Sequence, residues 1–117
     1  MVRGAFLFLL LLPLLSTSVQ SAPARIALVI GNGEYEHAPL KNPVSDAALM
    51  ATTLRDVGFE VMAHTNLNRR ALNRAFLRFA DRIKEAGSDI VSLVYYAGHG
   101  TQVNGENYLI PVGSLIK

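Results

Sequence analysis

The sequence predicts an α/β fold in which helices pack against a mostly parallel sheet. Three apolar runs, at residues 25–30, 59–64 and 89–96, alternate with two segments of helical periodicity, at 43–57 and 69–86. A helix between two strands returns the chain to the same end of the sheet, so this order predicts right-handed crossovers and parallel strands.

The first strand, at 25–30, is the unbroken run Arg-Ile-Ala-Leu-Val-Ile, and Gly-Asn-Gly at 31–33 ends it. Such a run is typical of a strand buried on both faces. After a loop at 34–40, Asn42 and Pro43 suit a helix N-cap and first helical position. The helix that follows has apolar residues at helical spacing and a terminal glycine: Ala47, Met50, Leu54, Val57 and Gly58.

The second strand is Phe-Glu-Val-Met-Ala-His at 59–64, and a polar linker at 65–68 follows it. Residues 69–86 predict the clearest amphipathic helix, because large apolar side chains recur on one stripe. These side chains are Leu72, Phe76, Phe79 and Ile83.

A third strand is predicted at 89–96, after Gly-Ser at 87–88 ends the second helix. We expect a glycine-rich loop at 97–106 and a short fourth strand at 107–110, ended by Pro111.

Residues 1–24 predict a secretory signal peptide. Arg3 is followed by a leucine-rich run at 5–15 that Pro13 interrupts, and then by small and polar residues at 16–22. About eleven apolar residues are too few to span a bilayer as a helix, although an uncleaved N-terminal anchor is the alternative. Cleavage is possible after Ser21, Ala22 or Ala24. We therefore expect a secreted or periplasmic protein.

The composition argues against several classes of function for the remaining domain, residues 25–117. The full chain has a net charge of +2 and 17% charged residues, and these values do not suggest a nucleic-acid-binding or membrane-surface protein. The chain contains no cysteine, which excludes disulfides, thiolate metal sites and a cysteine nucleophile within it. Since His37, His64 and His99 are scattered along the chain, we expect no metal site.

The predicted functional face lies at the carboxyl ends of the parallel strands. Glycines and histidines gather there, at 31–33, at His64 and at 97–100. Gly-Asn-Gly at 31–33 does not complete a dinucleotide-binding fingerprint, because its third glycine would fall at Glu36. We expect no nucleotide and no other cofactor.

His99 is the strongest candidate for catalysis. It stands between Gly98 and Gly100, so that a substrate carbonyl can approach the backbone N–H of Gly100 and the imidazole together. Acyl transfer needs this pairing of a general acid–base with a backbone donor. The alternative is that Gly-His-Gly only makes a tight turn after the strand.

Two further charged features each allow a functional and a purely structural interpretation. Asp46 could bind a basic substrate side chain, or it could simply be stabilised by the positive end of the first helix. The polar face of the second helix could bind anions, or it could be an ordinary solvated surface. It carries Arg70, Arg74 and Arg78.

Seven segments in this order resemble the caspase-like cysteine peptidases, particularly the bacterial caspase-domain and metacaspase group. They extend from the first strand to the residues before the C-terminus. They are Arg-Ile-Ala-Leu-Val-Ile-Gly-Asn at 25–32, Leu-Lys-Asn-Pro at 40–43, Asp-Ala at 46–47, Leu54, Gly-Phe-Glu-Val at 58–61, Tyr-Tyr-Ala-Gly-His-Gly at 95–100 and Asn-Tyr-Leu-Ile-Pro at 107–111.

The resemblance implies a three-layer sandwich around a mostly parallel sheet and hydrolysis of peptide bonds by a Cys–His dyad. His99 corresponds to the dyad histidine, and the Gly100 N–H to a donor of the oxyanion hole. Asp46 aligns with the acidic residue of the metacaspase S1 pocket, which implies Arg or Lys at P1, and Ala97 would also contact substrate. The acidic loop that gives metacaspases calcium dependence lies outside this chain.

One departure from the family is large. In caspases the nucleophilic cysteine lies about 50 residues after the histidine, whereas this chain ends at Lys117 without a cysteine. We therefore expect an incomplete domain that is inactive by itself. The alternative is a non-catalytic module that binds peptides or acts as a scaffold. A serine hydrolase is disfavoured, because no Gly-x-Ser-x-Gly elbow is present.

Overall fold

The computed structural model describes residues 3–4, 13–18 and 21–115. Half of the predicted signal peptide at 1–24 lies outside these residues, and the described residues before Ala24 form neither helix nor strand. In the part of the chain that is described, no helix is long and apolar enough to cross a membrane.

The central sheet has three parallel strands in the order β2-β1-β3. Their bounds are Ala24–Gly31 for β1, Glu60–Thr65 for β2 and Ile90–Ala97 for β3. Ile30, near the end of β1, pairs with His64 on one side and with Tyr96 on the other. The prediction of a parallel α/β sheet is confirmed.

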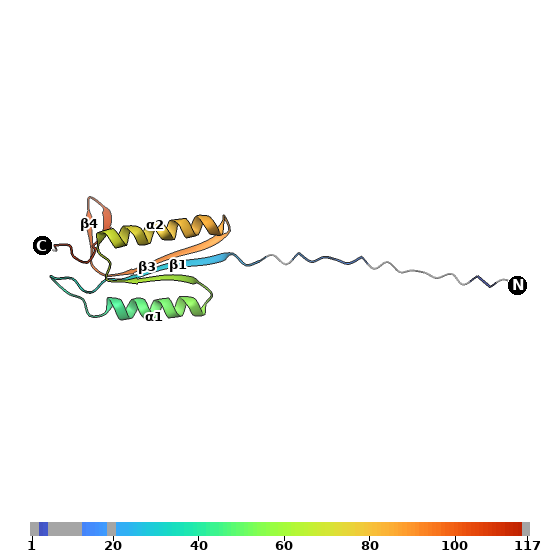
Figure 1. The fold of residues 1–117 in the computed structure, drawn as a ribbon, viewed down its shortest axis with the longest axis horizontal. Coiled ribbons are helices and arrows are strands. Elements are labelled where there is room, and N and C mark those ends of the chain that lie inside the picture. Colours follow the sequence, from blue (N-terminus) through green and yellow to red (C-terminus); the bar gives the residue numbers. More distant parts are fainter. Residues whose placement is uncertain (1–2, 5–12, 19–20, 116–117) are drawn as a thin grey trace.

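Two helices cover opposite faces of this sheet and make a three-layer arrangement (Figure 1). They are α1, Pro43–Asp56, and α2, Arg69–Ala86. Side chains of β1 alternate between the two faces, and its residues from 26 to 31 are all buried. One face carries Ala27 and Val29, which pack with α1. The other carries Ile26, Leu28 and Ile30, which pack with α2.

The apolar stripe predicted for α2 is confirmed. Leu72 and Phe79 are 7% exposed and form one core with the isoleucines of β1, and Phe76 and Ile83 pack against its rim. Asn68 caps the helix by accepting a hydrogen bond from the Ala71 N–H at 2.9 Å. The bounds of α2 coincide with the predicted 69–86.

The predicted end of α1 was off by one residue, and this changes one core assignment. Val57 follows the last helical residue and is 53% exposed, whereas Ala51 is buried in the core beside Ala47 and Leu54. Asn42 stands at the N-cap, but its side chain makes no capping bond. Its carbonyl oxygen instead accepts from the Ser45 hydroxyl at 2.9 Å.

The expectation of a glycine-rich loop at 97–106 was wrong in part. Residues 100–103 form β4, Gly100–Val103, which pairs antiparallel with β5, Glu106–Leu109. Asn104 and Gly105 connect the two strands with φ angles of 51° and 80°. An Asn-Gly pair with two positive φ angles is the favoured two-residue hairpin turn, and the sequence carried this signal.

Candidate active site

Two asparagines tie the carboxyl ends of the three strands together. The N–H of Asn32 donates to the Ala97 carbonyl at 2.8 Å, and its side-chain oxygen accepts from the Leu67 N–H at 2.8 Å. The N–H of Asn66 donates to the Gly31 carbonyl at 2.9 Å. The Asn66 side-chain oxygen accepts from two N–H groups of the loop after β1, at 3.0 and 3.1 Å. These bonds give the loops at this edge a rigid base.

His99 follows β3 on this edge, and its imidazole is held in one orientation. Its Nε2 atom lies 2.7 Å from the carbonyl oxygen of Ala38, in the loop between β1 and α1. A carbonyl oxygen can only accept, so in a neutral ring Nε2 carries the proton. Nδ1 then has a free lone pair and can receive a proton from a substrate or a nucleophile.

Backbone geometry at Ala38 aims this carbonyl at the histidine. Ala38 has a φ of 55°, in the left-handed region that non-glycine residues seldom adopt. A non-glycine residue there costs about 1–2 kcal/mol. This strained residue is the one that orients His99, and functional sites are where such strain is commonly found.

Two tyrosine hydroxyls hold the main chain of His99. The His99 N–H donates to the Tyr35 hydroxyl at 3.0 Å, and the Tyr96 hydroxyl donates to the His99 carbonyl at 2.8 Å. The two phenol oxygens are 3.1 Å apart, and both reach the Ile110 carbonyl, at 2.8 and 3.0 Å. The Tyr35 ring also meets the His99 imidazole edge-on, with centroids 4.5 Å apart. Both the backbone and the ring of His99 are thus restrained.

The surroundings of Tyr96 keep its phenol neutral. Burial raises the pKa of Tyr96 well above its usual value of 10.0, and its hydrogen bond with Tyr35 raises this pKa further. Tyr96 therefore acts as a neutral hydrogen-bonding group at physiological pH and does not supply a charge to the site.

A side chain at position 98 would not fit, because the two phenol groups occupy the space beside Gly98. A Cβ added at Gly98 would lie 2.6 Å from the Tyr96 oxygen and 2.8 Å from the Tyr35 oxygen. Gly31 plays a similar part on β1, where a Cβ would run into the Pro43 carbonyl and lie 2.7 Å from the Ala47 Cβ. The first turn of α1 is therefore packed directly on the end of β1.

This packing places the other predicted site residues at the same edge. Asp46 lies exposed in the first turn of α1, and Gly100 begins β4 one residue after His99. Ala97 ends β3, and its carbonyl oxygen accepts a hydrogen bond from the N–H of Asn32. The fold thus gathers His99, Gly100, Ala97 and Asp46 at one end of the sheet, and their roles stay predictions.

The other two histidines lie on β2 and in the loop after β1. His64 is the penultimate residue of β2, which β1 separates from β3, and His37 is exposed in the loop after β1, next to Ala38. Within the ranges that the structure describes, no group of His, Asp and Glu residues could hold a metal ion.

Three residues that position His99 were not predicted from the sequence: Tyr35, Ala38 and Tyr96. Two are tyrosines with mainly apolar surroundings, which look like core residues in a sequence. For Ala38 the sequence carries no signal, since alanine is not a residue expected at positive φ.

Comparisons with known proteins find similarity over most of the chain. The family model of the caspase domain matches residues 24–117. The human mucosa-associated lymphoid tissue lymphoma translocation protein 1 is 33% identical over 101 residues, which cover 83% of this chain and 12% of that protein. Its mouse homologue is 34% identical over 95 residues, covering 78% and 11%. The chain thus spans about an eighth of the curated relatives it matches.

Proposed function

This chain belongs to the caspase-domain family, and on that premise we propose that it supplies the histidine half of the Cys–His dyad of a cysteine endopeptidase. The observation that carries the proposal is the orientation of His99. Its Nε2 is engaged with the Ala38 carbonyl at 2.7 Å, which leaves Nδ1 as the proton acceptor. A histidine that activates a thiol needs one nitrogen oriented by a partner and the other free.

In the proposed reaction, the thiol comes from a cysteine that this chain does not contain. Nδ1 of His99 takes the thiol proton, and the thiolate sulfur bonds to the carbonyl carbon of the scissile peptide. The carbonyl π electrons move to oxygen, where the Gly100 N–H donates a hydrogen bond. The C–N bond then breaks as His99 returns the proton to the leaving amine, and water hydrolyses the thioester with His99 as base.

Asp46 is the proposed determinant of substrate choice. Its carboxylate is exposed on the first turn of α1, and α1 packs on the end of β1 beside the strand that leads to His99. A carboxylate at this edge favours a substrate with Arg or Lys at P1, because it can accept charge-assisted hydrogen bonds from either.

We further propose that residues 1–24 direct the protein out of the cytoplasm as a signal peptide. The support is the order of its segments: one basic residue, a leucine-rich run and then small polar residues. Mass spectrometry of the exported protein would test this, since cleavage should leave an N-terminus between residues 22 and 25.

The decisive experiment begins with the DNA that follows the Lys117 codon in the source genome. An open frame that encodes a cysteine about 50 residues after His99 is expected. The protein it encodes should cleave a fluorogenic peptide with Arg at P1. His99→Ala should abolish cleavage, and the matched control His64→Asn should retain it.

Two outcomes would contradict the proposal. One is a stop codon directly after Lys117 in the mature transcript, which would favour the peptide-binding module. The other is full cleavage by the His99→Ala variant of the longer protein.

A further inference from the structure

A cavity lies away from His99, between the end of β2 and one face of α2. Its volume is about 370 Å³, within the range of about 300–1,000 Å³ that is usual for small-molecule sites. Its lining combines two guanidinium groups and an imidazole with a small apolar wall. The lining residues are His64, Leu67, Ala71, Arg74, Ala75 and Arg78.

The positive charge of this cavity is uncompensated. Arg74 and Arg78 lie one turn apart on α2, and no carboxylate lines the cavity. Among the described residues, neither arginine is within ion-pair distance of a carboxylate, and the ion pairs on α2 are those of Arg82.

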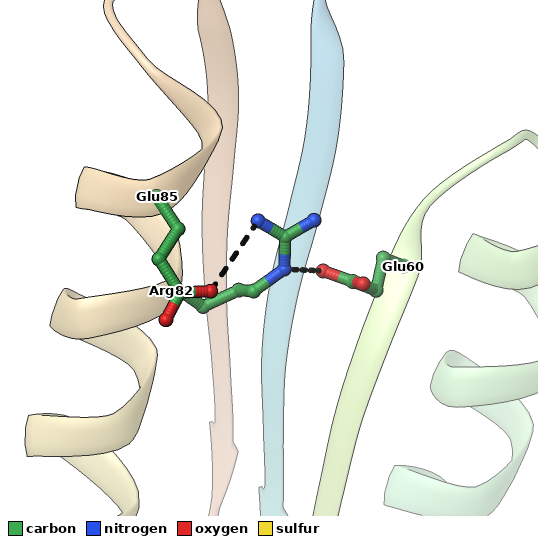
Figure 2. Close-up of polar contacts among 3 residues, drawn as sticks. All are labelled: Glu60, Arg82 and Glu85. Carbon is green, nitrogen blue, oxygen red and sulfur yellow. Dashed lines mark ion pairs between the residues drawn. The ribbon is translucent and has the colours of Figure 1, made fainter.

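Arg82, further along the same helix, differs from Arg74 and Arg78 because it forms ion pairs with carboxylates. Its guanidinium lies 2.7 Å from a Glu60 oxygen and 4.0 Å from a Glu85 oxygen (Figure 2). Glu60 is on β2, the same strand that ends at the cavity. One end of the β2–α2 interface is therefore balanced in charge, and the other end is positive.

The pKa of His64 reflects its burial and this positive potential. Burial lowers the pKa of His64 below its usual 6.5, and the nearby Arg78 guanidinium lowers it further. A neutral imidazole has one N–H, which it can donate to an anion without adding a third charge.

We propose that this cavity binds a phosphomonoester, with the phosphate between Arg74 and Arg78 and the organic group against Leu67, Ala71 and Ala75. Guanidinium forks match the geometry of phosphate oxygens, and a dianion balances two arginines. Inorganic phosphate alone would leave the apolar wall uncovered, so the organic group contributes to affinity. Such binding requires neither a cysteine nor the proposed peptidase activity.

The test is a titration of the 117-residue chain, followed by NMR, with phenyl phosphate, inorganic phosphate and benzoate. Phenyl phosphate should shift the His64 ring and Ala71 amide signals and bind most tightly of the three. Arg74→Gln and Arg78→Gln should each raise its Kd about ten-fold, the usual effect of losing one charge-assisted contact. Arg74→Lys, which keeps the charge and loses the fork, should fall in between.

Arg70→Gln is the matched control. It removes the same charge from the same helix one turn earlier, outside the cavity lining, and should change Kd by less than about two-fold. An equal effect of Arg70→Gln and Arg74→Gln would overturn the proposal, because the general charge of α2 would then explain binding. Tighter binding of benzoate, or no shift of the His64 ring with any probe, would also overturn it. Unchanged β1 amide signals in each variant would show that its fold is intact.

Discussion

The Nε2 atom of His99 lies 2.7 Å from the carbonyl oxygen of Ala38, a residue 61 positions earlier in the chain. This contact joins the loop after β3 to the loop after β1, and it determines which imidazole nitrogen can accept a proton. Tyr35 restrains the same residue, because its hydroxyl accepts the His99 N–H at 3.0 Å. Four predictions follow from this arrangement and from the charges around it.

Tyr35→Phe should lower the free energy of unfolding by about 1–3 kcal/mol, since the partly buried His99 N–H loses its acceptor. Urea denaturation would measure the loss, and the ¹⁵N shifts of the His99 ring should show a less uniform tautomer. Tyr95→Phe is the control, because the Tyr95 ring packs on the α1 face of the sheet and away from His99. Equal losses in the two variants would argue against a positioning role for Tyr35.

Gly98→Ala should destabilise the domain by about 1–3 kcal/mol, the usual range for overpacking. The added methyl group would lie 2.6 Å from the Tyr96 oxygen and force the phenol pair apart. Gly100→Ala is the matched control, because its Cβ would meet the Tyr108 carbonyl at 3.4 Å, close to an ordinary contact. Thermal and urea unfolding of both variants check the difference, and a neutral Gly98→Ala would contradict it.

Stability should decrease as the pH falls below about 6.5, because the pKa of His64 is lower in the folded than in the unfolded chain. In this range the unfolded imidazole takes up a proton, whereas the folded one, half-buried beside Arg78, stays neutral. The unfolded state then binds more protons, so the loss continues until folded His64 is also protonated.

Urea denaturation between about pH 5 and 8, where histidine titrates, would measure this dependence. His64→Asn should make the decrease shallower, and Arg78→Gln should reduce it in part by removing one of its causes. A profile of unchanged slope in His64→Asn would assign the pH dependence to other groups.

Asp46→Asn should lower kcat/KM for substrates with Arg at P1 by about a hundred-fold in the proposed longer protein that contains the cysteine. The amide keeps the size of the side chain and loses the charge that attracts guanidinium. Asp56→Asn, at the opposite end of α1, is the control and should leave kcat/KM unchanged. Comparable losses for Arg and norleucine substrates would show that Asp46 does not select the P1 residue.

Most of the fold could be predicted because its signals are local. The buried run of β1 and the apolar stripe of α2 each lie within one element, and their periodicity identifies that element. The strand predicted at 107–110 corresponds to β5, but β4 and its pairing with β5 were missed although Asn104 and Gly105 signal the turn. β4 is short and exposed, so no apolar alternation indicated it.

The sequence by itself determined the element order and placed His99 between two glycines after a strand. Parallel topology then required His99 and the first turn of α1 to share one edge of the sheet. Only the tertiary structure decided how His99 is held. Its partners Ala38 and Tyr35 lie 61 and 64 residues away, and no local pattern encodes a contact between loops that become neighbours only when β1 pairs with β3.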